Sequence, residues 1–130
     1  MNSVAAGVGK PSVNNDLFWI FTLAVKPGKF ADFKALVAQI VKASSHEPGT
    51  IAYQYSANQE KTVVHIYERY RDSEAFVSHV NQTFGAYAER FLSFVDVAGL
   101  VVYGEPNAVA RKALDAFNAS YMNLFDGFSR

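Results

Sequence analysis

The sequence predicts an α+β fold in which an antiparallel sheet carries helices on one face. The chain of 130 residues has the length of one domain, and it is 50% hydrophobic and 15% aromatic, which is enough for a core. Strand-like and helix-like runs follow one another along it in the order β-α-β-β-α-β. Both faces of the predicted sheet carry apolar side chains, so we expect a second copy of the chain to cover the face that the helices leave open.

The first half of this order is a strand, a helix and a strand. Residues 17–25, LFWIFTLAV, are β-branched and aromatic and predict a strand buried on both faces. After a turn at 26–29, apolar residues recur at helical spacing to about Ser44. They are Phe30, Phe33, Leu36, Val37, Ile40 and Val41. The breaker HEPGT at 46–50 then leads to an alternating strand at 51–58, IAYQYSAN, with Ile51, Tyr53 and Tyr55 on one face.

The second half is a strand, a helix and a strand. The alternating run TVVHIYERY at 62–70 predicts the second strand of a hairpin, with Glu68 and Tyr70 on one face and Tyr67 on the other. Asp72 or Ser73 is expected to cap a helix. The inner stripe of that helix consists of Ala75, Phe76, His79 and Val80. Gly85 is expected to interrupt it, and residues 95–104 form the last strand. This is the ferredoxin-like order.

Both ends of the chain lie outside this unit, which spans 17–104. Residues 1–16 are rich in small and polar residues and predict a flexible N-terminal arm. After Pro106, apolar residues are spaced for one helix of about five turns, which gives a C-terminal helical extension at 105–130. They are Ala110, Leu114, Phe117, Tyr121, Leu124 and Phe128. Such a helix can pack on its own domain or on a partner subunit.

Charge and cysteine content exclude several functions. Twelve Lys and Arg balance twelve Asp and Glu, so nothing predicts binding to nucleic acid or to an anionic membrane. There is no cysteine, which rules out disulfides, thiolate metal sites and cysteine nucleophiles. The longest apolar run, 17–25, is too short to span a membrane, and the N-terminus has no signal-peptide pattern. We therefore expect a cytoplasmic protein.

Three stretches resemble one known family. The family's strand–PG–helix–EPG–strand order is found in VKPGKFADFKALVAQIVKASSHEPGTIAYQY. The family's strand end, acidic helix cap and helical histidine are found in IYERYRDSEAFVSHV, and a strand near 97–103 completes the set. Together they are similar to the antibiotic biosynthesis monooxygenase domain over about residues 17–104. The resemblance implies a dimeric α+β barrel, with a pocket between sheet and helices in each subunit.

The resemblance also implies a range of activities. Some members of the family oxidise phenolic or quinol-type compounds with O2 and no prosthetic group, others degrade haem, and others handle small signalling molecules. The haem-degrading members place Asn on the first strand, and Trp and then His on the second helix. Here the first strand has no Asn, His79 stands at the Trp position, and Glu89 stands at the position of the later His. A carboxylate does not replace the neutral nitrogen ligand of haem iron, so we expect no haem and no other cofactor.

His79 and Glu68 are the predicted catalytic residues. An imidazole titrates near neutral pH, so His79 can take the proton of a phenol and leave an electron-rich phenolate that reacts with O2. Glu68 can orient His79 or accept a substrate hydroxyl. The alternative is a half-buried histidine that bonds a backbone carbonyl or Glu68 and does no chemistry.

Aromatic side chains are the predicted walls of the substrate site, since they stack on flat ligands. They are Trp19, Tyr53, Tyr55, Tyr67, Tyr70 and Phe76. Because tyrosines on alternate faces of a strand cannot line one pocket, some of these residues belong to the core or to a dimer interface. Arg69 and Arg71 are expected at solvated strand ends. The three histidines are too dispersed to predict a metal site.

Two classes of function follow from these residues. The first is a cofactor-independent monooxygenase that acts on a small aromatic, quinol or polyketide-like phenol. The second is a non-catalytic dimer that binds a hydrophobic ligand or serves in a stress response. An isomerase that uses His79 as a proton shuttle remains a third alternative, because reaction with O2 leaves no residue signature when no cofactor is bound.

Overall fold

The computed structural model describes residues 16–130, so the arm predicted at 1–16 lies almost wholly outside the described residues. The elements follow one another as β2 (Leu17–Val25), α1 (Phe30–Ser44), β3 (Thr50–Ala57), β4 (Val63–Tyr70), α2 (Ser73–Gln82), η1 (Phe84–Ala86), α3 (Ala88–Phe94), β5 (Val95–Tyr103), α4 (Ala108–Asp115) and β6 (Ser120–Met122). The predicted β-α-β-β-α-β order is confirmed by β2 to β5.

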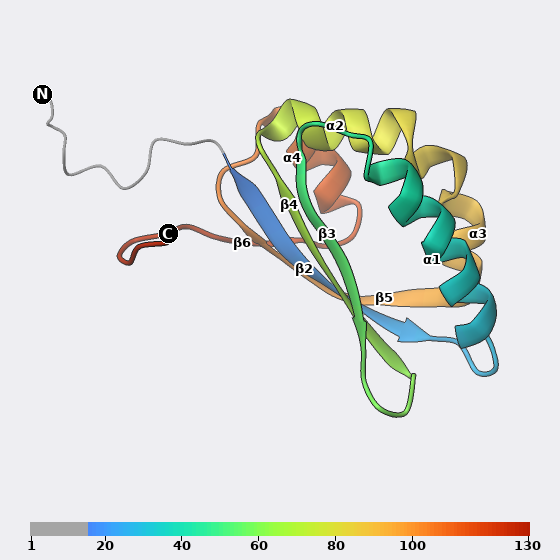
Figure 1. Cartoon of the computed structure of the whole chain (residues 1–130). Coiled ribbons are helices and arrows are strands. Elements are labelled where there is room, and N and C mark those ends of the chain that lie inside the picture. Colours follow the sequence, from blue (N-terminus) through green and yellow to red (C-terminus); the bar gives the residue numbers. More distant parts are fainter. Residues whose placement is uncertain (1–15) are drawn as a thin grey trace, which may run out of the picture.

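The sheet has the strand order β3-β4-β2-β5-β6 and is not closed into a barrel within one chain. Strand β2 lies between β4 and β5 and pairs antiparallel with both. Strand β3 pairs antiparallel with β4 and forms the edge next to α1. Figure 1 shows the helices gathered over one face of this twisted sheet.

The core lies between the sheet and these helices. The β2 residues Leu17, Trp19 and Leu23 point toward the helices, because successive side chains of a strand alternate between faces. One cluster of buried residues joins Trp19 and Tyr70 to α2 and α4, and a second joins Leu23 to α1 and α3. The helices therefore cover most of this face of the sheet, and a site on it lies between strand and helix.

The second helix is divided where the sequence predicts an interruption. Asp72 caps α2 by accepting a hydrogen bond from Ala75 N–H at 2.8 Å, as expected. The helix ends at Gln82, and a single 3₁₀ turn containing Gly85 separates it from α3. This division lets Phe84 and Phe91 pack edge to face beneath α1, with ring centroids 5.0 Å apart.

The prediction of a five-turn C-terminal helix is wrong, because α4 ends at Asp115. Asn118 adopts φ 58°, a left-handed conformation that Asn tolerates and that ends helices. Residues Ser120–Met122 then run parallel to β5 as a fifth strand, so the sheet is mixed. The Tyr121 hydroxyl donates to Asp115 at 2.6 Å, which ties this strand to α4. Helical spacing of the apolar residues did not reveal that Asn118, which lies between two of them, takes a left-handed conformation.

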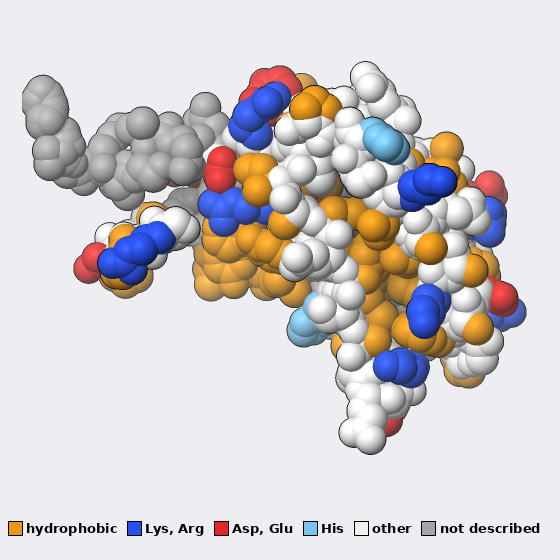
Figure 2. Space-filling view, in the orientation of Figure 1, with side chains coloured by type: hydrophobic (Ala, Val, Ile, Leu, Met, Phe, Trp, Pro, Cys, Tyr) orange, Lys and Arg blue, Asp and Glu red, His pale blue; other side chains and the backbone are white. Residues whose placement is uncertain are grey.

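The sheet face opposite the helices is largely apolar and open in the single chain. Phe18 stacks on Tyr103 with ring centroids 4.9 Å apart, and Tyr67 lies beside Phe18 at 6.3 Å. Ile20 and Val101 are register partners in the middle of this face. Beyond it, Phe125 and Phe128 of the C-terminal segment are 96% and 78% exposed, and Figure 2 shows this segment projecting from the body. We define the open face by Phe18, Ile20, Tyr67, Val101 and Tyr103.

Candidate functional site

His79 lies on the inner face of α2 and is buried, with 3% of its side chain exposed. Residues three positions apart share one face of a helix, so His79 lies on the same face as Phe76, which is also buried. Its Nδ1 lies 3.0 Å from Oε1 and 3.2 Å from Oε2 of Glu47. The Ser44 hydroxyl lies further from Nδ1, at 3.5 Å. The histidine is therefore half of a buried His–Glu pair.

Glu47 comes from the loop between α1 and β3. Its carboxylate accepts hydrogen bonds from the hydroxyls of Thr50, at 2.7 Å, and of Thr83. A carboxylate only accepts, so His79 must present Nδ1–H to it. In the neutral imidazole this leaves the lone pair on Nε2, which has no hydrogen-bond partner among residues 16–130. The pair therefore sets the tautomer in which Nε2 is a base.

Sequence reasoning missed Glu47. It predicted that Glu68 orients His79 or accepts a substrate hydroxyl; in the structure the carboxylate beside His79 Nδ1 is that of Glu47, and Glu68 accepts a hydrogen bond from Tyr70. Glu47 belongs to the HEPGT breaker, where no periodicity marks a functional residue. Only the crossover from β2 through α1 to β3 brings this loop beside α2, where Arg71 N–H donates to Gly49 C=O at 2.9 Å.

Aromatic rings surround the His79 imidazole. The ring centroids of Tyr53, Tyr70 and Phe84 lie 5.0, 5.6 and 6.1 Å from its own. Such a cage excludes water and makes the electrostatic effect of the Glu47 carboxylate stronger than it would be in solvent. We call these three rings the His79 cage.

Glu68 lies next to this cage on β4 and is buried. The Tyr70 hydroxyl donates to Oε1 of Glu68 at 2.6 Å. Burial raises the pKa of Glu68 above its ordinary value, and the Tyr70 hydrogen bond, the charge of His79 and the nearby Trp19 N–H offset this only in part. The Trp19 indole N–H itself is buried without a hydrogen bond of good geometry. The shift favours protonation of Glu68 relative to an exposed carboxyl, and the protonated form can donate as well as accept.

Two tyrosine hydroxyls form a second polar pair. The hydroxyl oxygens of Tyr53 and Tyr55 lie 2.7 Å apart on the helix face of β3. Burial raises the pKa of both phenols, and the neighbouring carboxylate of Glu68 raises them further. Both therefore stay protonated at neutral pH, and the pair has one hydroxyl hydrogen left to donate to another group.

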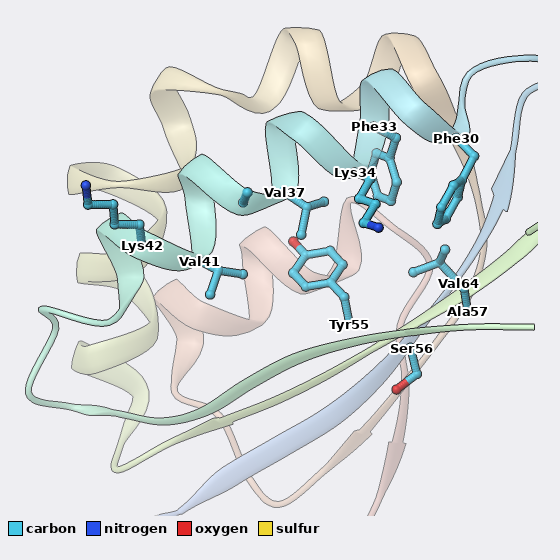
Figure 3. A pocket seen from close by; sticks show the side chains of 11 residues that line it. Phe30, Phe33, Lys34, Val37, Val41, Lys42, Tyr55, Ser56, Ala57 and Val64 are labelled. Atoms are coloured by element: carbon cyan, nitrogen blue, oxygen red, sulfur yellow. The ribbon is translucent and has the colours of Figure 1, made fainter.

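An apolar groove of about 500 Å³ runs between α1 and the edge strand β3. Figure 3 shows its lining side chains from both elements, with the Tyr55 hydroxyl directed toward α1. Tyr55 is the one residue of the predicted substrate site that lines this groove. His79 does not line it, and Tyr53 connects the two sites because it bonds Tyr55 and packs on His79.

The remaining predicted residues are divided between core and surface. Trp19 and Phe76 pack edge to face in the core, with centroids 4.7 Å apart, and do not line the groove. Tyr67 lies on the open face, opposite Glu68 and His79. Arg69 pairs with Asp16 at 2.7 Å, and Arg71 lies 3.5 Å from Asp72. The six predicted aromatic residues therefore do not form one wall.

The part of the chain that the structure describes has neither a cluster of metal-ligating side chains nor a membrane-spanning helix. Within residues 16–130, no group of three or more His, Asp or Glu side chains is arranged to hold a metal ion. No helix in the same range is both long and apolar enough to cross a membrane.

Comparison with known proteins decides the family. The antibiotic biosynthesis monooxygenase profile matches residues 17–94, more than half of the chain. The chain is a member of the antibiotic biosynthesis monooxygenase family. The match covers β2 to α3 and so contains Glu47, Glu68 and His79.

Solved structures share the fold of this antibiotic biosynthesis monooxygenase domain. MupZ from Pseudomonas fluorescens is 24% identical, with a TM-score of 0.77 over 90% of this chain and 96% of its own. A putative antibiotic biosynthesis monooxygenase from Caulobacter crescentus is 25% identical, with a TM-score of 0.59 over 68% of this chain and 86% of its own. One from Bacteroides thetaiotaomicron is 24% identical, with a TM-score of 0.60 over 72% and 90%. No curated protein sequence matches the chain significantly.

Proposed function

We propose that this chain is a cofactor-independent monooxygenase that oxidises a small aromatic, quinol or polyketide-like phenol. One observation carries the proposal: the buried His79–Glu47 pair inside an aromatic cage, in a domain of the monooxygenase family. His79 is the catalytic base, Glu47 is the positioning residue, and Glu68 is a proton donor or acceptor for the substrate hydroxyl.

The chemistry balances without a bound cofactor. Nε2 of His79 takes the proton of a phenol whose ring carries an oxidisable methylene, and the electron-rich anion reduces O2. The two combine as a peroxide at that carbon, and the imidazolium returns its proton to the peroxide. Loss of water then leaves a carbonyl. The substrate carbon gives up four electrons, one oxygen atom enters the product and the other leaves as water.

The position of the groove favours a second candidate. Because Tyr53 separates the groove from His79, a ligand in the groove reaches the imidazole only if Tyr53 moves. A non-catalytic protein that binds a hydrophobic ligand or serves in stress needs no such movement. An isomerase would use the same His79 base and differs only in needing no O2.

We also propose a homodimer that forms through the open face, with Phe125 and Phe128 in contact with the partner. Proteins of this family are generally small and dimeric. An apolar face left open next to exposed phenylalanines supports this interface, since soluble chains rarely expose such area. We propose that the dimer is cytoplasmic, and the lack of cysteine fits that reducing compartment.

Oxygen uptake tests the enzyme directly. Native protein, His79→Ala and His46→Ala would be compared with a panel of hydroquinones and polycyclic phenols. His46 is an exposed histidine near Glu47, so His46→Ala controls for removal of an imidazole. We expect uptake by native protein and His46→Ala and none by His79→Ala. Equal uptake by all three, or no uptake from any phenol, would favour the ligand-binding candidate.

A further inference from the structure

The groove between α1 and β3 is apolar in its body and basic at its edges. Its floor and walls include Phe30, Phe33, Val37, Val41 and Val64. Its lining spans α1 from residue 30 to residue 42, which corresponds to about 18 Å at the rise of an α-helix. A volume of about 500 Å³ lies within the range of small-molecule sites.

The charges on the groove are all of one sign. Lys34 and Lys42 line it two turns of α1 apart, and no acidic residue lines it. Figure 3 shows Lys34 near Tyr55 in this view and Lys42 at the other end of the groove. Lys61 adds a third cation 5.8 Å from the Phe30 ring. This arrangement complements an anion attached to an apolar body.

Tyr55 supplies a neutral donor to the same site. Its pKa is raised by burial, so it stays a phenol, and its oxygen points toward α1 (Figure 3). When the Tyr53 hydroxyl donates to Tyr55, the Tyr55 hydrogen is free for a ligand. An ammonium and a hydroxyl are a suitable pair of donors for a carboxylate.

We propose that the groove binds an amphipathic carboxylate, with its apolar body along α1 and its carboxylate on Lys34 and Tyr55. Lys42 contributes a weaker, long-range attraction from the far end. The site is distinct from the His79 cage, and this inference concerns binding alone. A test of this binding therefore does not depend on whether the monooxygenase reaction occurs.

The test is calorimetric titration of the full chain with dodecanoate below its micellar concentration, beside dodecanol and dodecyltrimethylammonium as uncharged and cationic probes. We expect one dodecanoate per chain and an affinity at least tenfold above that of either control. Shortening the acid to decanoate removes two methylenes and should weaken binding about fourfold for each. Equal affinity for all three probes would overturn the proposal.

Substitutions locate the site. Lys34→Gln should weaken dodecanoate binding about tenfold and Lys42→Gln less, because a charge-assisted hydrogen bond is lost at Lys34. Lys112→Gln, on α4 and away from the groove, is the matched control and should change nothing. Unchanged affinity in Lys34→Gln overturns the proposal. If Lys34→Gln or Lys42→Gln changes the mass of the protein in sedimentation, a second chain occupies the groove, and that result also overturns the proposal.

Discussion

Nδ1 of His79 on α2 lies 3.0 Å from Oε1 of Glu47, a residue 32 positions earlier in the loop after α1. The two elements meet only through the fold, and the two hydroxyls that also bond the Glu47 carboxylate hold it in place. The contact fixes which imidazole nitrogen is free. Any buried imidazole N–H needs an acceptor, so the feature that we connect to chemistry is the lone pair that this contact leaves on Nε2.

Glu47→Gln tests the orienting role of this carboxylate. The amide retains the shape of Glu47 but loses its charge and one acceptor, so we expect turnover to fall between about ten- and a hundredfold. Nitrogen NMR of His79 should show Nδ1–H in the native protein and a mixture of tautomers in the variant. Glu74→Gln, on the exposed side of α2, is the control. An unchanged tautomer and rate would mean that Glu47 does not orient the imidazole.

Glu68 should make the stability of the fold depend on pH. Its pKa is raised in the folded chain, so its contribution is fully present below the ordinary pKa of 4.5 and is lost as pH rises through the folded value. Each unit of difference corresponds to about 1.4 kcal/mol. Glu68→Gln still accepts from Tyr70 but cannot ionise, so urea unfolding should show less loss of stability between pH 5 and pH 8. A variant that loses as much stability as the native chain would contradict this.

Gly49 holds the Glu47 loop against α2. A Cβ at this position would lie 2.5 Å from the Ala75 Cβ, so Gly49→Ala must displace the loop or the helix. We expect a loss of about 1–3 kcal/mol in the free energy of unfolding, together with reduced turnover. Gly99→Ala is the matched control, because its Cβ would meet only ordinary contact at 3.9 Å. Equal stability of the two variants would show that the contact at Gly49 is easily relieved.

The C-terminal segment should contribute to stability in two unequal parts. Ala110 and Leu114 of α4 are buried against the cluster that contains Trp19, so ending the chain after Pro106 exposes core. We expect that truncation to unfold the chain or to lower its free energy of unfolding by more than about 3 kcal/mol. Ending the chain after Asn118 keeps α4 and should cost much less. Similar urea midpoints for the two truncations would contradict this division.

The proposed dimer can be broken at the open face. Val101→Lys places a charge in the middle of this face, next to Ile20, and should yield monomers in sedimentation. Val109→Lys is the control, since Val109 is 64% exposed on α4, away from the open face. A dimer that persists in Val101→Lys with native stability would place the interface elsewhere.

Periodicity predicted the fold well and the site poorly. Alternation in TVVHIYERY placed Glu68 and Tyr70 on one face and Tyr67 on the other, as the structure confirms. Glu47 was missed because loop residues carry no period, and its partner is set by a crossover. The tail was misjudged because a 4, 3, 4 spacing does not show that Asn118 takes a left-handed conformation and ends the helix.

Labelling with ¹⁸O2 tests the central claim most directly. Native protein and His79→Ala would be incubated with the phenol that gives the greatest oxygen uptake, and the mass of the product would be measured by mass spectrometry. The account predicts one labelled oxygen atom per product molecule from native protein, the second in water, and no labelled product from His79→Ala. Labelled product in equal amounts from both proteins, or product without label, would contradict it.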